Sequence, residues 1–146
     1  MSNTALWEVQ KAVVSAMTSS TTLTTLVSSK IYDEPPTNED YPYIVVGNPT
    51  ETGDNTLQKL GFNNTIICFI YTKPYGLGWY PATQIFDAMN AVLNAKRLPL
   101  TNLNIVHCKN DNVMHEVDKD KRILHVRYRI FSQKKTNHNY WIINYL

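Results

Sequence analysis

The sequence is poor in the residues that mark several classes of protein. Its two cysteines, Cys68 and Cys108, are too few for a disulfide framework, and a reducing compartment of synthesis fits their scarcity. Charged residues make up 18% of the chain, below the usual quarter, and 15 Thr and 15 Asn take their place. This deficit argues against a generic nucleic-acid binder. The longest apolar run, Ile66 to Tyr71, is too short for a membrane-spanning helix, and the chain starts without the basic region of a signal peptide.

Motifs for catalysis and for metal or phosphate binding are also missing. His107 and Cys108 are adjacent in a predicted strand, so their side chains point to opposite faces and cannot share a metal ion, and Cys68 and His115 add no ligand spacing. The sequence has no Gly-x-Ser-x-Gly motif, and its five glycines, including those of 76–78, form no phosphate-binding loop. We therefore expect no enzyme, no metal site and no cofactor.

The apolar pattern predicts one domain with two main helices. Apolar residues recur at helical spacing over 5–17, with Thr4 as the expected N-cap, and again from Pro81 to about residue 95. A short helical turn capped by hydroxyl groups is expected within 18–27, and residues 30–36 are expected to be extended. These helices must bury their apolar stripes on a sheet.

Alternating apolar residues predict the strands of that sheet. The predicted strands are 43–47, 64–72, 105–117 and 122–132, with a polar loop over 50–61. Because residues 64–72 are apolar on both faces, we expect a central strand covered on both sides. The sequence thus predicts an α+β fold, in which a mainly antiparallel, mixed sheet of about four to five strands packs against two helices.

Charge is distributed unevenly along the chain. Residues 1–95 carry four basic and eight acidic groups, a net −4, whereas residues 96–146 carry ten basic and four acidic groups, a net +6. Such asymmetry indicates oriented contacts with a charged partner, including another copy of the chain. The alternative is that two surfaces of one domain differ by chance.

Three features are candidates for contact surfaces, each with two interpretations. Trp7 and Val14 form an apolar line beside the main helix stripe, so they either flank a broad core face or meet a neighbouring subunit. His125, Arg127 and Arg129 share one face of the last strand, at a spacing compatible with successive phosphates. The alternative for these is a solvated face with Asp111 or Glu116 as partners across the hairpin.

The third feature is the apolar and aromatic segment at 140–146, which begins with Tyr140 and Trp141. A segment this apolar is not expected to stay in water. It either adds a strand to its own sheet or docks on another chain.

The order of these features resembles the tail-completion, or tail-terminator, family of long-tailed bacteriophages. The helix over 6–17, the segments 31–36 and 41–48, the aromatic-led helix over 79–95, and the closing hairpin that ends at 127–131 carry the resemblance. It spans roughly residues 5–132, so we expect a single tail-terminator-like α+β domain over 1–132 and a C-terminal extension over 133–146.

The resemblance implies a structural virion protein and no active site. Members of the family assemble as a ring, typically hexameric, that caps the tail tube, stops addition of tube protein and joins the tail to the head connector. The implied partners are further copies of the chain, the tail tube protein, the head-completion or connector protein, and DNA that passes without sequence readout. The implied location is the head-proximal end of the virion tail, after assembly in the host cytoplasm. No membrane is implied.

The resemblance supplies no site residues, so the candidate interface is our own hypothesis. It comprises Trp7, Val14, Asp33, Glu34, Arg127, Arg129, Tyr140 and Trp141. We favour pairing of Arg127 and Arg129 with the acidic 33–40 loop of a neighbouring subunit. The other hypothesis is that His125, Arg127 and Arg129 line a DNA channel. The alternative functions are a head-completion or minor tail ring protein and a small monomeric nucleic-acid-binding module.

Overall fold

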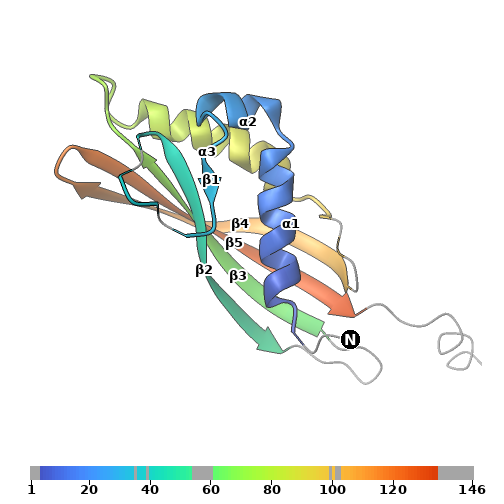
Figure 1. Ribbon diagram of the computed structural model, residues 1–146. Helices are drawn as coiled ribbons and strands as arrows, with labels where there is room; N and C mark the ends of the chain where they lie inside the picture. The colour runs from blue at the N-terminus through green and yellow to red at the C-terminus, as the bar shows by residue number, and fades with distance from the viewer. Residues whose placement is uncertain are drawn as a thin grey trace, which may run out of the picture.

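A computed structural model describes residues 4–34, 36–38, 40–53, 61–98, 100 and 103–134 of the chain. Three helices lie on one face of a five-stranded sheet whose strand order is β1-β2-β3-β5-β4 (Figure 1). The elements in chain order are α1 (Leu6–Thr18), α2 (Thr21–Leu26), β1 (Ile31–Tyr32), β2 (Tyr43–Gly53), β3 (Gly61–Thr72), α3 (Tyr80–Leu93), β4 (Leu103–Asp118) and β5 (Lys121–Lys134). Strand β1 is parallel to β2, and every other neighbouring pair is antiparallel. The predicted α+β fold with a mixed sheet is confirmed.

The core lies between the helices and the face of the sheet that they cover. Alternate residues of β2, β3 and β5 point toward the helices because side chains in a strand alternate between the two faces. The buried side chains of this face include Ile44, Val46, Ile66, Cys68, Ile70, Leu124, Val126, Tyr128 and Ile130. They pack against the apolar stripes of α1 and α3, which consist mainly of Val9, Val13, Met17, Ile85, Met89 and Leu93.

Strand β3 is central, as predicted, but it is covered on one side. Ile66, Cys68 and Ile70 are buried under the helices, whereas the residues between them, including Phe69 and Tyr71, are half-buried on the opposite face. The prediction of cover on both sides is therefore wrong for the single chain, because all three helices lie on one face (Figure 1). This leaves a partly apolar sheet face toward the solvent.

The predicted polar loop over 50–61 is wrong in its first part. Strand β2 continues to Gly53, and its residues Thr50, Glu51 and Thr52 pair with Thr65 and its neighbours in β3 after a register shift that follows Gly47. These residues are polar because this half of the strand is largely exposed.

The longer β2 adds Glu51 to the start of α1, where the predicted cap Thr4 accepts a hydrogen bond from the Leu6 amide at 3.2 Å. The Ala5 amide donates to Oε1 of Glu51 at 2.6 Å, and the Thr4 hydroxyl donates to Oε2 of the same carboxylate at 2.9 Å. A carboxylate at this end also interacts favourably with the helix dipole. The hydroxyl cap expected for the short second helix is present, since the Ser20 side chain accepts a hydrogen bond from the Leu23 amide at 3.2 Å.

The two edges of the sheet differ. At one edge, β1 is only two residues long. At the other edge, β4 has 16 residues, and the segment after α3 covers part of it. The Ala95 amide donates to the Cys108 carbonyl at 2.6 Å, and the Asn94 side chain accepts from the Asn110 amide at 3.0 Å.

Candidate subunit interface

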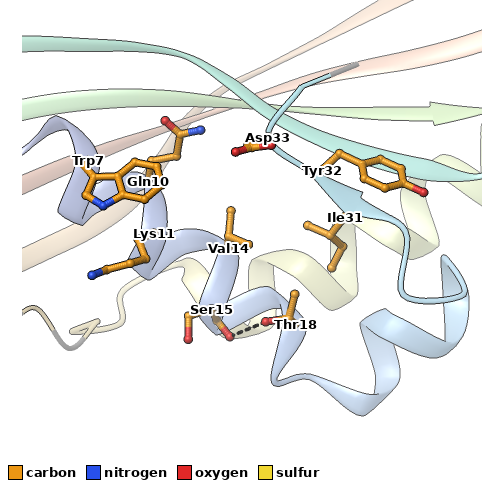
Figure 2. Close-up of a pocket in the computed structure, with 9 residues that line it drawn as sticks. All are labelled: Trp7, Gln10, Lys11, Val14, Ser15, Thr18, Ile31, Tyr32 and Asp33. Carbon is orange, nitrogen blue, oxygen red and sulfur yellow. Dashed lines mark hydrogen bonds between the residues drawn. The ribbon is translucent and has the colours of Figure 1, made fainter. Parts of the chain in front are cut away.

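A groove runs between α1 and the edge strand β1. It encloses about 440 Å³ and is lined by Trp7, Gln10, Lys11, Val14, Ser15, Thr18, Ile31, Tyr32 and Asp33 (Figure 2). Residues of α1 three or four apart share one side of the helix, so Trp7, Lys11 and Val14 form one wall. Strand β1 and the turn that follows it form the other wall. The groove therefore combines aromatic and aliphatic side chains with one positive and one negative charge.

Three of the predicted interface residues meet in this groove. Trp7 is 64% exposed, whereas Val14 is partly buried against the core, so the two residues of the predicted apolar line have different surroundings. Asp33 faces them from the end of β1 (Figure 2), and Glu34 is exposed next to it in the chain. In the sequence analysis, Trp7 and Val14 were chosen for their apolar line and Asp33 for its charge.

The remaining lining residues were not among the predicted interface residues. Gln10 and Lys11 lie on what the sequence identifies as the polar side of α1, and Ile31 and Tyr32 form a short extended segment. They could have been predicted from their positions in the sequence, close to Trp7, Val14 and Asp33.

A cluster of basic side chains lies toward the other edge of the sheet. Arg127 Nε is 2.8 Å from Oδ1 of Asp111, and Arg129 Nε is 3.3 Å from Oδ2 of the same carboxylate. Hydrogen bonding to Asp111, followed by its negative charge, raises the pKa of the Arg127 guanidinium. Nearby, His125 Nε2 lies 2.7 Å from Oε1 of Glu116. Partners across the hairpin, one of the two interpretations of this strand face, are thus present.

A bulge in β4 places Asp111 between the two arginines. The register with β5 shifts between Asn110 and Asn112, so Asp111 leaves the regular ladder and reaches both guanidinium groups. The Asn110 side-chain amide supports this shape by donating to the carbonyls of Arg127 at 2.9 Å and Asn112 at 3.2 Å.

The cluster keeps positive charge and access to solvent. One carboxylate faces two guanidinium groups, and Lys109, which pairs with Arg129 in the β4–β5 ladder, adds a third cation to this face. The side chains of Arg127 and Arg129 are 41% and 49% exposed. Asp111 alone does not neutralise both arginines, and each has room for a second anionic partner.

The groove and the basic cluster lie toward opposite edges of the sheet. Asp33 follows β1 at one edge, whereas Arg127 and Arg129 are on β5, next to the opposite edge strand β4. Tyr140 and Trp141, the other two predicted interface residues, lie outside the described residues.

The cysteine and histidine side chains are dispersed. Cys68 and Cys108 are free and buried, and desolvation raises both thiol pKa values, that of Cys108 to about 12. His107 stacks on Phe131, on the side of β4 opposite to Cys108, as the strand pattern predicts. Among the described residues, no three His, Cys, Asp or Glu side chains are placed to hold a metal ion. Within the same ranges, no helix combines the length and apolarity needed to cross a membrane.

Comparison with known proteins gives a family and two similar solved structures. The family described as Tail completion protein gp17 matches residues 11–131. A solved chain described as "Virion of native gene transfer agent (GTA) particle" is 20% identical with a TM-score of 0.81, covering 90% of this chain and 99% of that chain. A second solved chain is 8% identical with a TM-score of 0.59, covering 88% and 98%. At these identities the two structures show a shared fold. Among curated protein sequences, none matches this chain.

Proposed function

The chain belongs to the Tail completion protein gp17 family, and from this premise we propose that it forms a ring, a hexamer, at the head-proximal end of a phage-like tail. The ring caps the tail tube, ends the addition of tube protein and joins the tail to the head connector. Its neighbours are the tube protein on one side and the head-completion or connector protein on the other. DNA passes through it without sequence readout.

The placement of the two contact surfaces supports a ring. Closed rings use head-to-tail contacts, in which one patch of a subunit meets a different patch of the next subunit. The groove with Asp33 and the basic cluster with Arg127 and Arg129 lie toward opposite edges of one sheet, as such a contact needs. This placement is the observation that carries the proposal beyond family membership.

Charge complementarity determines the pairing that we favour. Asp33 and Glu34 follow the edge strand β1, and the basic cluster retains positive charge after Asp111 is counted. In the ring, Arg127 and Arg129 of one subunit pair with Asp33 and Glu34 of the next. The same arginines cannot make this contact and also line the DNA channel with His125, which is the competing assignment.

A charge-swap series tests this proposal. Reversal of both arginines (R127E/R129E) places two carboxylates opposite the acidic turn of the next subunit, so we expect ring formation to fail. Electron microscopy of the resulting particles is expected to show separate heads and tails of uncontrolled length. Adding D33R/E34R to the same chain restores the complementarity with opposite signs, and rings are expected to return in part.

The matched control is K73E/K119E, which makes the same change in net charge at the β4–β5 turn and the neighbouring end of β3. It should assemble normally, because the contacts of Lys73 are at the surface: an ion pair with Asp120 at 3.8 Å and a position over the Tyr41 ring at 5.3 Å. Because R127E/R129E also faces Asp111 within its own chain, each variant is checked for folding by circular dichroism. If folded R127E/R129E forms normal rings but packages or ejects DNA poorly, the channel assignment holds instead. A chain that stays monomeric at every concentration and on tails rules out the ring.

A further inference from the structure

The proposed ring assigns a partner to Asp33 but none to the apolar part of the groove beside α1 or to the apolar segment at 140–146. We propose that the groove of one subunit binds residues 140–146 of a neighbouring copy of the chain. The proposal rests on the ring proposed above and names what occupies one of its two contact surfaces.

The length of the groove matches that of a short extended segment. Its α1 wall runs from Trp7 to Thr18, which is about 16 Å at 1.5 Å per helical residue. Five extended residues span about the same distance at roughly 3.3 Å each. Residues 141–145 therefore fit along the groove, with Trp141, Ile143 and Tyr145 directed to one side.

The chemistry of the groove matches the composition of the segment. Residues 136–146 contain no Asp, Glu, Lys or Arg, and most of 140–146 is aromatic or aliphatic. The groove offers Trp7, Val14 and Ile31 as apolar contacts, and among the described residues that line it only Lys11 and Asp33 are charged. Trp7, 64% exposed, supplies a large flat surface of the kind that aromatic side chains cover at interfaces.

Strand β1 adds little backbone pairing to this contact. It is the edge strand of the sheet and borders the groove (Figure 2). The Ile31 amide already donates to the Ser29 carbonyl at 3.1 Å, so this two-residue strand offers few backbone groups to an extended segment. The apolar wall, with β1 as its border, therefore provides most of the proposed contact.

The path of the chain favours a neighbouring copy as the donor. Residues 135–146 follow β5, which carries Arg127 and Arg129 on the side of the molecule proposed to meet the groove of the next subunit. From Lys134 to Tyr140 the chain can reach about 20 Å. Its own β1 is three strands away, about 14 Å across the sheet, and it is level with His125, which lies about 30 Å back along β5 from Lys134. Self-docking along the whole groove therefore exceeds this reach, and the experiment separates the two donors.

Cysteine cross-linking between two differently labelled chains makes this separation. One chain carries V14C in the groove and the other carries I143C in the segment. The native thiols of Cys68 and Cys108 are buried and remain silent. When the two chains are mixed at a concentration that permits assembly and are oxidised, we expect a disulfide-linked dimer of one copy of each. The control pair replaces V14C with V117C, which lies on β4, exposed and outside the groove, and should give about tenfold less product because disulfides need Cα atoms within about 7 Å.

The outcomes separate this inference from the proposed ring. A disulfide that forms only within a single chain carrying both cysteines shows self-docking and overturns the inference. Equal product from the V14C and V117C mixtures, or no product, also overturns it. If rings form in the charge-swap series without the V14C–I143C product, the ring stands and the occupant of the groove is wrong. If that product forms but rings do not, the contact stands and the ring is wrong.

Discussion

At the scale of single residues, the two thiols lie where solvent does not reach them. Cys68 on β3 and Cys108 on β4 both contribute to the core beneath the helices. Burial removes the solvation that a thiolate needs, so the pKa of each thiol is raised, that of Cys108 to about 12. Because the thiolate is the reactive form, burial lowers the reactivity of both thiols in the folded chain.

These raised pKa values predict a loss of stability at alkaline pH. Above about pH 8.5 the unfolded chain releases the thiol protons, whereas the folded chain keeps them, so the unfolded state gains stability as the pH rises. Because a thiol of the unfolded chain is half ionised at about pH 8.5, each buried thiol should lower the free energy of unfolding by about 1.4 kcal/mol in total between pH 7.5 and 9.5. Urea denaturation between pH 7.5 and 9.5 measures this slope. The slope should drop by about half in C108A, and an unchanged slope in C108A would contradict the assignment.

The cap of α1 shows what local sequence reasoning misses at this scale. The Thr4 hydroxyl accepts from the Leu6 amide, as predicted for a cap, but it also donates to Glu51, and the Ala5 amide donates to the same carboxylate. Glu51 is 46 residues away from Ala5, so no local pattern identifies it. By contrast, the partner of Arg127 and Arg129 was predictable, because Asp111 lies across a hairpin whose turn the sequence reveals.

At the scale of elements, α1 has two faces with different tasks. Met17 and its neighbours on the buried stripe hold the helix on the sheet, whereas Trp7 faces the groove and is 64% exposed. A large aromatic side chain in that position contributes little to the fold of the single chain. In the proposed contact, Trp7 contributes to binding of the segment that covers it.

The two faces predict opposite effects of substitutions on the same helix. M17A leaves a cavity in the core and should lower the free energy of unfolding by about 2–5 kcal/mol. W7A should change it by less than about 0.5 kcal/mol but weaken self-association. Chemical denaturation and sedimentation velocity of the two variants test this pair. A large loss of stability in W7A would mean that Trp7 belongs to the core.

The elements that sequence reasoning predicted are those with apolar periodicity. The helices over 5–17 and 81–95 and the central strand over 64–72 agree with α1, α3 and β3 to within a few residues. The second half of β2 was missed because Thr50, Glu51 and Thr52 are polar, with both threonines exposed, on a strand whose partner is also polar there. One-sided cover of β3 could not be predicted either, because half-buried residues such as Phe69 have the composition of a buried face.

At the scale of the whole molecule, the uneven charge of the sequence corresponds to charged groups at different places on the sheet. The acidic turn after β1 and the basic cluster on β5 lie toward opposite edges of the sheet, so the −4 and +6 halves of the chain provide complementary sides. The net charges of the two parts of the chain, −4 and +6, follow from the sequence alone. Their positions across the sheet required the strand order, because residues 33 and 127 are far apart in the chain.

This arrangement predicts association that depends on concentration and salt. We expect the isolated chain to be monomeric or weakly associated when dilute and to form rings when concentrated. Since charges at a partly exposed contact are screened beyond about 8–10 Å at physiological ionic strength, added salt should shift the chain toward monomers. Sedimentation equilibrium over a range of NaCl concentrations measures the shift. The same mass at all concentrations and salt levels would refute it.

The partly covered edge of β4 affects whether chains can stack on this strand without limit. A long uncovered edge strand is a template on which further chains can stack without limit, as in fibrils. Here the segment after α3 occupies this edge at its middle, through Ala95 on the Cys108 carbonyl and Asn94 on the Asn110 amide. An incoming strand therefore finds backbone groups already engaged partway along β4. These two contacts interrupt the template that the middle of β4 would otherwise offer to another chain.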